Sequence, residues 1–206
     1  MAAVSGRIVV LVSGSGSNLA ALADACARGE VPGRVVAAVA DRDCPGLELA
    51  RQRSIETRVV AFPGPEQRES WSQELRDVVR SYVPDLVVSA GFMRILSGVF
   101  VDAFYGRLIN LHPSLLPAFP GAHAVRDALA AGVDHTGTTV HFVDHLVDHG
   151  PVIRQERVPI EPGDTEESLH ARIKAVEHRL LPQVCAMLLR GEVRLEHGRV
   201  TRDART

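Results

Sequence analysis

The chain has 206 residues, 46% of them apolar and 23% charged, and it carries a formal net charge of -2. Its basic residues are scattered and matched by acids, which argues against a nucleic-acid partner and favours small-molecule substrates. The three cysteines form no CxxC pair, so neither a disulfide framework nor a zinc site is indicated.

The first half of the chain, about residues 1–105, alternates apolar runs with amphipathic segments. The runs predict strands at residues 8–12, 35–40, 58–62 and 86–90, and helical spacing predicts helices at residues 19–26, 47–53 and 71–82. The first run is five residues long, too short for a signal peptide or a membrane span, so we expect a cytoplasmic protein without membrane contact. The alternation predicts right-handed crossovers and a Rossmann-like, doubly wound α/β fold with a mostly parallel sheet.

The second half, about residues 106–206, is punctuated differently, although we expect one domain over residues 1–206. Its pattern predicts strands at residues 108–111, 138–143 and 152–158, a proline-rich loop at residues 113–120 and a helix at residues 124–131. Only a short polar loop separates the last two strands. We therefore expect an antiparallel pair or a mixed edge in the C-terminal part of the sheet.

A long helix follows, with Asp164 and Glu167 expected to cap it. Its predicted buried face comprises Leu169, Ile173, Val176 and Leu180. Pro182 is expected to kink or end this helix, because proline lacks the backbone N–H of the helical ladder. The tail after it resembles a small hairpin that turns at His197 and Gly198.

A glycine-rich loop, residues 13–18 (Ser-Gly-Ser-Gly-Ser-Asn), joins the first strand to the first helix. Glycine N–H groups, polar side chains and the positive end of the helix dipole favour phosphate binding there. A dinucleotide fingerprint is incomplete, because Leu19 occupies the third glycine position, and the Lys of a nucleoside-triphosphate P-loop is absent. The alternative is a glycine-rich turn with a Ser or Asn helix cap.

Asn110 and His112 stand two residues apart at the end of a predicted strand. Strand alternation puts both on one face, so an amide donor and a titratable imidazole converge on one atom. Such a pair suits acyl transfer, in which a protonated His112 and the Asn110 amide would stabilise an oxyanion together. The alternative is a strand end with two polar surface residues.

His141, His145 and His149 recur every four residues, interleaved with acidic residues. On a helix this spacing would align metal ligands, but β-branched residues open the segment and Gly-Pro closes it. We therefore expect a strand and a loop, with no metal. Asp148 near His112 would instead favour the imidazolium by its charge, and the other histidines are expected in solvated loops or as partners of catalytic groups.

Four ordered motifs resemble the phosphoribosylglycinamide formyltransferase family of purine synthesis. They are residues 9–19, residues 90–97 (Ala-Gly-Phe-Met-Arg-Ile-Leu-Ser), residues 110–117 (Asn-Leu-His-Pro-Ser-Leu-Leu-Pro) and the stretch from residue 137 through 153. The resemblance spans nearly the whole chain. It implies the formyltransferase fold and transfer of a formyl group from 10-formyltetrahydrofolate to the amine of glycinamide ribonucleotide.

The resemblance also implies a set of site residues. Asn110, His112 and Asp148 match the family's catalytic set, with His112 as general acid. The positions that match the ribonucleotide site are Ser15, Gly16, Ser17, Asn18, Pro113 and Glu177. Lys174, three residues before Glu177, would add charge near the phosphate. The positions that match the folate site are Arg68, Met93, Arg94, Ile95, Leu96 and Asn110, although Arg94 is equally consistent with a solvated surface charge.

Other functions share parts of this pattern. The catalytic set also resembles methionyl-tRNA formyltransferase and formyltetrahydrofolate hydrolase, which are expected to carry an additional C-terminal or N-terminal domain. A non-catalytic nucleotide-binding module would not need all three catalytic residues. His149 stands where many relatives carry a second glycine, so loop conformation or titration is expected to differ. The pattern also leaves a homodimer open.

Overall fold

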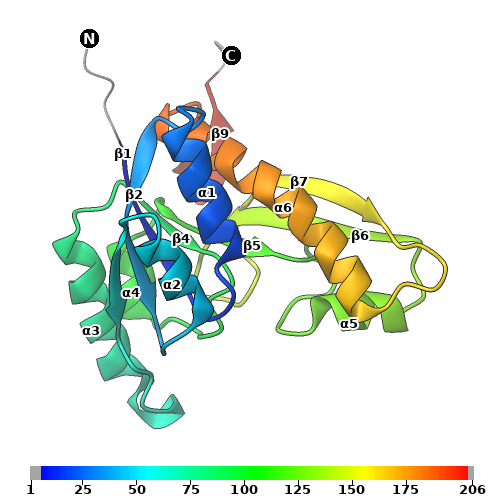
Figure 1. Ribbon diagram of the computed structural model, residues 1–206, viewed down its shortest axis with the longest axis horizontal. Coiled ribbons are helices and arrows are strands. Elements are labelled where there is room, and N and C mark those ends of the chain that lie inside the picture. The colour runs from blue at the N-terminus through cyan, green and yellow to red at the C-terminus, as the bar shows by residue number, and fades with distance from the viewer. Residues whose placement is uncertain (1–5, 204–206) are drawn as a thin grey trace.

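The computed structural model describes residues 6–203 and contains a seven-stranded sheet with the order β3-β2-β1-β4-β5-β6-β7 (Figure 1). The strands are β1 (Gly6–Val12), β2 (Gly33–Ala40), β3 (Glu56–Val59), β4 (Leu86–Ser89), β5 (Leu108–His112), β6 (His135–Phe142) and β7 (Val152–Pro159). Strands β1 to β5 pair in parallel, whereas β6 pairs antiparallel with both β5 and β7. The expected α/β fold, with a mostly parallel sheet and an antiparallel C-terminal part, is confirmed.

Helices cover both faces of the sheet (Figure 1). They are α1 (Ser17–Ala27), α2 (Pro45–Arg51), α3 (Arg68–Ser81), α4 (Gly98–Ala103), α5 (Ala124–Ala130) and α6 (Glu166–Leu189), with a 3-10 turn at Pro65–Gln67. Strands β8 (Val193–Glu196) and β9 (Arg199–Arg202) form the expected terminal hairpin. Within residues 6–203, no helix has the length and apolar character needed to cross a membrane.

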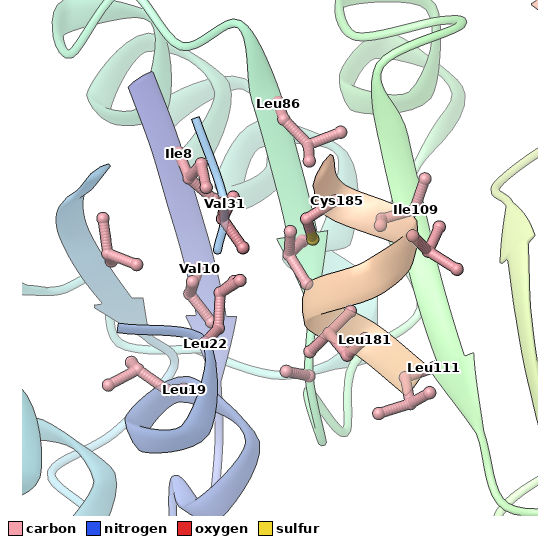
Figure 2. Packing of buried hydrophobic residues seen from close by; sticks show 14 of the residues in the cluster. Ile8, Val10, Leu19, Leu22, Val31, Leu86, Ile109, Leu111, Leu181 and Cys185 are labelled. Carbon is pink, nitrogen blue, oxygen red and sulfur yellow. The ribbon is translucent and has the colours of Figure 1, made fainter. Parts of the chain in front are cut away.

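Alternate residues of β1 enter two different hydrophobic cores. Ile8 and Val10 pack with α1 and α6, as Figure 2 shows through Leu22 and Leu181. The intervening residues of β1 pack with α3 and α4 on the opposite face, where Trp71 is buried. Because both faces of the sheet are covered, the sequences of its central strands are continuously apolar instead of alternating between apolar and polar residues.

Helix α6 runs through Pro182 to Leu189, so the prediction that the proline would end it is wrong, whereas a kink at that residue stays a prediction. An interior proline costs a helix about 3 kcal/mol. On either side of it, Leu180, Leu181 and Val184 have no exposed surface, and full burial of each such side chain contributes about 1.5–3 kcal/mol. Burial of this stripe against the sheet outweighs the lost hydrogen bond, and the helix continues.

The cap of α6 lies one residue later than the sequence predicted. Thr165 accepts the backbone N–H of Ser168 and the Ser168 hydroxyl accepts the N–H of Thr165, which is a reciprocal capping box. Asp164 accepts from the Ser168 hydroxyl at 2.7 Å instead of pairing with Glu167. On the expected buried face only Val176 is less than fully buried.

Strand β3 and helix α4 also differ from the sequence-based expectation. Strand β3 ends at Val59 rather than at residue 62, although backbone contacts with the neighbouring segment continue beyond it, as the Phe62 N–H donates to the Asp41 carbonyl at 3.1 Å. Helix α4 was not predicted at all. It has six residues, too few for a helical period to be recognised, and it buries Phe100 and Val101.

Strand addition changes side between β1 and β4. Strands β2 and β3 extend the sheet on one side of β1, and β4 and β5 extend it on the other. In such sheets ligands bind beyond the carboxyl ends of the strands at this switch point. Ser13 follows β1 and donates its N–H to the Gly91 carbonyl after β4 at 3.1 Å, while Asn110 and His112 end the neighbouring β5. The two motifs singled out in the sequence therefore share one edge of the sheet.

Candidate active site

The glycine-rich loop turns sharply into α1. Gly16 is the N-cap residue and has a φ of +74°, so the alternative of a Ser or Asn cap is wrong. A Cβ at Gly16 would lie 2.4 Å from the Cα of Gly46, whose N–H donates to the Gly14 carbonyl at 2.9 Å. This close approach needs glycine on both sides. The first-turn N–H groups of α1 have no partner within the helix and offer a binding position for an anion.

A cavity of about 220 Å³ opens between this loop and α6. It is lined by every residue that the sequence analysis placed in the ribonucleotide site, namely Ser15, Gly16, Ser17, Asn18, Pro113, Lys174 and Glu177. Met93 of the predicted folate set lines the same cavity, as do Gly91 and Leu111. Residues about 160 positions apart meet here because α1 and α6 lie side by side on one face of the sheet (Figure 1).

Glu177 is buried at the wall of this cavity and is held by two donors. The Asn18 amide nitrogen donates to Oε2 at 2.8 Å and the Thr138 hydroxyl lies 3.4 Å from Oε1. Burial raises the pKa of Glu177, although these two hydrogen bonds oppose the rise. The Asn18 side-chain oxygen is buried without a hydrogen-bond partner among residues 6–203, which leaves an acceptor for a ligand.

Asn110 is oriented by a buried histidine. Its amide nitrogen lies 3.2 Å from His141 Nε2 and 3.5 Å from Asp148 Oδ1. His141 Nδ1 faces the Phe142 carbonyl at 2.8 Å, so Nδ1 carries the proton and Nε2 accepts from Asn110. Burial lowers the pKa of His141, which keeps the ring neutral. His141 is thus a partner of Asn110, a predicted catalytic residue, and takes one of the two positions expected for it.

His112 is 5% exposed and has an acceptor at each ring nitrogen. Nδ1 lies 3.4 Å from Asp148 Oδ2, and Nε2 lies 2.9 Å from the Phe119 carbonyl. The same Asp148 oxygen accepts the Gly121 N–H at 2.8 Å, which fixes the carboxylate. Both ring nitrogens of His112 therefore face an oxygen acceptor. The structure brings Asp148 to His112, as the sequence predicted.

Exposed apolar side chains occur in two segments, one of which reaches the cavity through Met93. Met93 and Ile95, in the irregular stretch between β4 and α4, are 63% and 53% exposed. Leu146 and Val147, in the loop after β6, are 60% and 56% exposed. The loop that carries Leu146 and Val147 lies against the start of α4, because a Cβ built at Gly98 would lie 3.5 Å from the ring of His145. Exposed apolar surface of this kind marks a ligand-binding groove or an interface.

The two arginines of the predicted folate set are in different situations. Arg94 donates from Nε to Asp41 Oδ2 at 2.6 Å and lies over the Phe62 ring, so it is not a solvated surface charge. Arg68, at the start of α3, has a buried Nε without a hydrogen-bond partner in the described part of the chain. A charged donor left unpaired points to an acceptor supplied by a ligand.

The four-residue histidine period does not fall on a helix, as expected. His141 ends up in β6, His145 contacts Asp102 at 3.0 Å, and His149 contacts Asp144 at 3.3 Å. Between residues 6 and 203, no group of three or more His, Cys, Asp or Glu side chains is placed to hold a metal ion.

Sequence reasoning missed His170, which lines the cavity from α6. It stands four residues before Lys174 and seven before Glu177, so helical spacing places all three on one face and could have identified it. Burial and the neighbouring Lys174 lower the pKa of His170. It is therefore neutral at physiological pH and lines the cavity as an uncharged side chain.

Comparison with known proteins agrees with this geometry. A profile described as formyl transferase matches residues 6–185. The chain belongs to the formyl transferase family. A phosphoribosylglycinamide formyltransferase from Mycobacterium tuberculosis is 50% identical over 182 residues, which cover 88% of this chain and 84% of that protein. The resemblance to the phosphoribosylglycinamide formyltransferase branch, seen first in the sequence motifs, is confirmed.

Solved structures of formyl transferases show the same fold. Glycinamide ribonucleotide transformylase 1 from Symbiobacterium toebii has a TM-score of 0.91 and 44% identity, with 96% of this chain and 94% of that chain covered. A formyltetrahydrofolate deformylase from Pseudomonas syringae pv. tomato has a TM-score of 0.88 and 25% identity, covering 96% of this chain but 66% of its own. Transferases and a hydrolase therefore share this architecture.

Proposed function

We propose that this protein transfers the formyl group of 10-formyltetrahydrofolate to the amine of glycinamide ribonucleotide, which yields formylglycinamide ribonucleotide and tetrahydrofolate for purine biosynthesis. One observation carries the proposal. Asn110, His112 and Asp148 converge beside the cavity, and Leu111 and Pro113, the neighbours of His112, line its wall together with the glycine-rich loop. A module that only binds nucleotides has no need for this set.

The cavity fits a phosphorylated amine. The N–H groups at the start of α1 and the Lys174 side chain would hold the phosphate of the ribonucleotide. The unpaired Asn18 oxygen and the Glu177 carboxyl lie deeper, where they would accept hydrogen bonds from the ribose or the glycinamide amine. Pro113 and Ser15 would close the walls.

The folate would lie along the segment from Met93 to Leu96. Its exposed apolar side chains would cover the pteridine ring, and its backbone groups would read the ring edge. The buried, unpaired Nε of Arg68 would meet an acidic group of the folate, such as the carboxylate of its glutamate tail. Asn110 would contact the formyl group, since it stands at the strand end that both substrates approach.

The reaction needs one bond made and one bond broken at the formyl carbon. The amine attacks this carbon, and the resulting oxyanion accepts hydrogen bonds from the Asn110 amide and the His112 imidazolium. The bond from carbon to N10 of the folate then breaks, and a proton passes from the attacking nitrogen to N10 by way of water held at Asp148. The Phe119 carbonyl oxygen lies 2.9 Å from His112 Nε2. The formyl oxygen must therefore take the place of this carbonyl before His112 can donate to the oxyanion.

A steady-state assay tests the proposal. Purified protein is mixed with 10-formyltetrahydrofolate or its dideaza analogue, and the deformylated folate is followed by absorbance with and without glycinamide ribonucleotide. Turnover that depends on the ribonucleotide supports the transferase. Equal turnover in its absence would mean a hydrolase, as in the deformylase relative, and no turnover would leave a binding module or another acceptor.

The same proposal includes the cellular setting. We assign the protein to the cytoplasm, with two small-molecule substrates, no nucleic acid and no membrane, and with no metal in the reaction. A homodimer remains compatible with it and is read from sedimentation of the purified protein.

A further inference from the structure

The segment between β4 and α4 carries the residues assigned to the folate, yet it has no regular secondary structure of its own. Met93 and Ile95 are mostly exposed, so their side chains do not anchor it. The position of this folate wall, defined as residues 91–97, must therefore be set by contacts with its neighbours.

Backbone contacts tie both ends of the folate wall. Ser13 donates its N–H to the Gly91 carbonyl at 3.1 Å, and its hydroxyl accepts the N–H of Met93 at 2.9 Å. At the other end the Ser97 N–H donates to the Ser72 hydroxyl on α3 at 3.2 Å. Because Ser13 opens the glycine-rich loop, the folate wall is fastened directly to the predicted phosphate site.

The middle of the folate wall is held by Arg94. Its Nε donates to Asp41 Oδ2 at 2.6 Å, and its guanidinium lies 4.5 Å from the centre of the Phe62 ring. Phe62 packs edge-on against Trp71, with 4.9 Å between the ring centres, and Trp71 stacks on Phe92, with 6.2 Å between the ring centres. The chain of contacts returns to the folate wall, since Phe92 and Arg94 both belong to it.

Asp41 anchors this arrangement from the end of β2, and its side chain has no exposed surface. Burial acts to raise the pKa of Asp41, but hydrogen bonding from Ser13 and Arg94 and the nearby positive charges outweigh burial and lower it. The carboxylate is therefore ionised at neutral pH, and its contact with Arg94 is a charge-assisted hydrogen bond. Arg42 also reaches the same oxygen, at 3.5 Å, but its side chain is 51% exposed.

We propose that Asp41 is a positioning residue for the folate: through Arg94 it fixes the folate wall against the glycine-rich loop, at the spacing that a pteridine ring requires. Asp41 itself touches neither substrate in this arrangement. The inference rests on the proposed function, because it takes residues 93–96 as the folate-binding segment.

The test compares Asp41→Asn with Arg42→Ala. The first variant keeps the shape of the anchor and removes its charge, and the second removes the exposed partner of the same oxygen without touching the folate wall. Asp41→Asn is expected to raise KM for the folate about tenfold while KM for the ribonucleotide stays within about twofold. Arg42→Ala is expected to leave both constants within about twofold. An unchanged folate KM in Asp41→Asn, or equal rises in both constants, would overturn the inference.

A second variant and a second readout guard against misfolding. Arg94→Gln removes the other half of the contact, and adding Asp41→Asn to it is expected to have no further effect on the folate KM, because the two residues act through one contact. Additive effects would contradict the proposal. Trp71 is the one tryptophan of the chain, so acrylamide quenching of its fluorescence reports on the stack without substrates. Quenching is expected to increase in Asp41→Asn and not in Arg42→Ala.

Failure of the proposed function is distinguishable from failure of this inference. A wild-type protein without turnover on either substrate combination overturns both. An active wild-type protein whose folate KM and Trp71 quenching do not respond to Asp41→Asn overturns the positioning role alone.

Discussion

His112 and Asp148 form a buried pair, with Nδ1 of the ring 3.4 Å from Oδ2 of the carboxylate and with side chains that are 6% and 10% exposed. The pair joins two distant parts of the chain, the end of β5 and the loop after β6. Asp148 takes a left-handed backbone conformation, with φ at +54°, and Gly121 donates to its carboxylate. A non-glycine residue in this region is held there by its surroundings, which places strain at the loop where chemistry is proposed.

Replacing the carboxylate tests whether this pair serves catalysis. Asp148→Asn keeps the side-chain size but removes the negative charge beside the His112 ring, so turnover is expected to fall by about 10²–10⁴ while the Kd of a folate analogue changes little. Asp144→Asn, in the same loop but contacting His149, is the matched control and should retain near wild-type turnover. Turnover of Asp148→Asn within about threefold of wild type would remove Asp148 from the mechanism. His112→Ala is expected to behave as Asp148→Asn does.

Asn110 is proposed to supply the second donor to the oxyanion. Asn110→Ala is expected to lower kcat by about 10²–10³, the usual loss when one oxyanion donor is removed. His141→Ala should lower kcat less, because it leaves the amide in place and only frees its orientation at the 3.2 Å contact. The double variant should be no slower than Asn110→Ala alone. Single-turnover kinetics with both substrates saturating measures these rates, and independent losses from the two residues would contradict the coupling.

Much of this site follows from strand ends. The continuous apolar run before the glycine-rich loop and the run before Asn110 are both recognisable as buried parallel strands, and parallel strands present their carboxyl ends at one edge. The meeting of Glu177 with Asn18 was predicted only from the family resemblance, because no periodicity links residues 159 positions apart. The sequence did not identify Asp41 as an anchor, because an acidic residue after a strand does not show which residues will pack around it. The sequence predicted an end of the helix at Pro182, because local helix propensity does not include the burial of α6 against the sheet.

Glu177, a proposed binding residue, is expected to weaken the fold at neutral pH. Burial raises its pKa above the unfolded value, so its contribution to stability is fully present below the unfolded pKa, near the ordinary 4.5, and is lost as pH rises through the folded pKa. Glu177→Gln removes that loss and keeps hydrogen-bonding partners, because the Thr138 hydroxyl can donate to the His112 carbonyl and accept from the new amide.

Glu177→Gln is therefore expected to be more stable than wild type at neutral pH, by about 2–4 °C in Tm for each kcal/mol gained, with the difference disappearing in acid. The same change should raise KM for the ribonucleotide about tenfold or more, since a charged acceptor is lost. Thermal melts from pH 4 to pH 8 and steady-state kinetics check both parts. A Tm difference between Glu177→Gln and wild type that becomes smaller from pH 4 to pH 8 would contradict the predicted direction of the pKa shift.

The glycine-rich loop offers a comparison between two of its own glycines. Gly16→Ala demands a left-handed backbone and puts a Cβ 2.4 Å from the backbone of Gly46, whereas a Cβ at Gly14 meets nothing within 4 Å. Gly16→Ala is therefore expected to cost at least about 1–2 kcal/mol of folding free energy, and Gly14→Ala less than about 0.5 kcal/mol. Urea unfolding measures both free energies.

Where Gly16→Ala still folds, displacement of the first turn of α1 should weaken ribonucleotide binding more than folate binding. The proposed anion position is built from that turn, whereas the folate wall is not. Equal unfolding midpoints for the two variants would show that the close approach to Gly46 is not required.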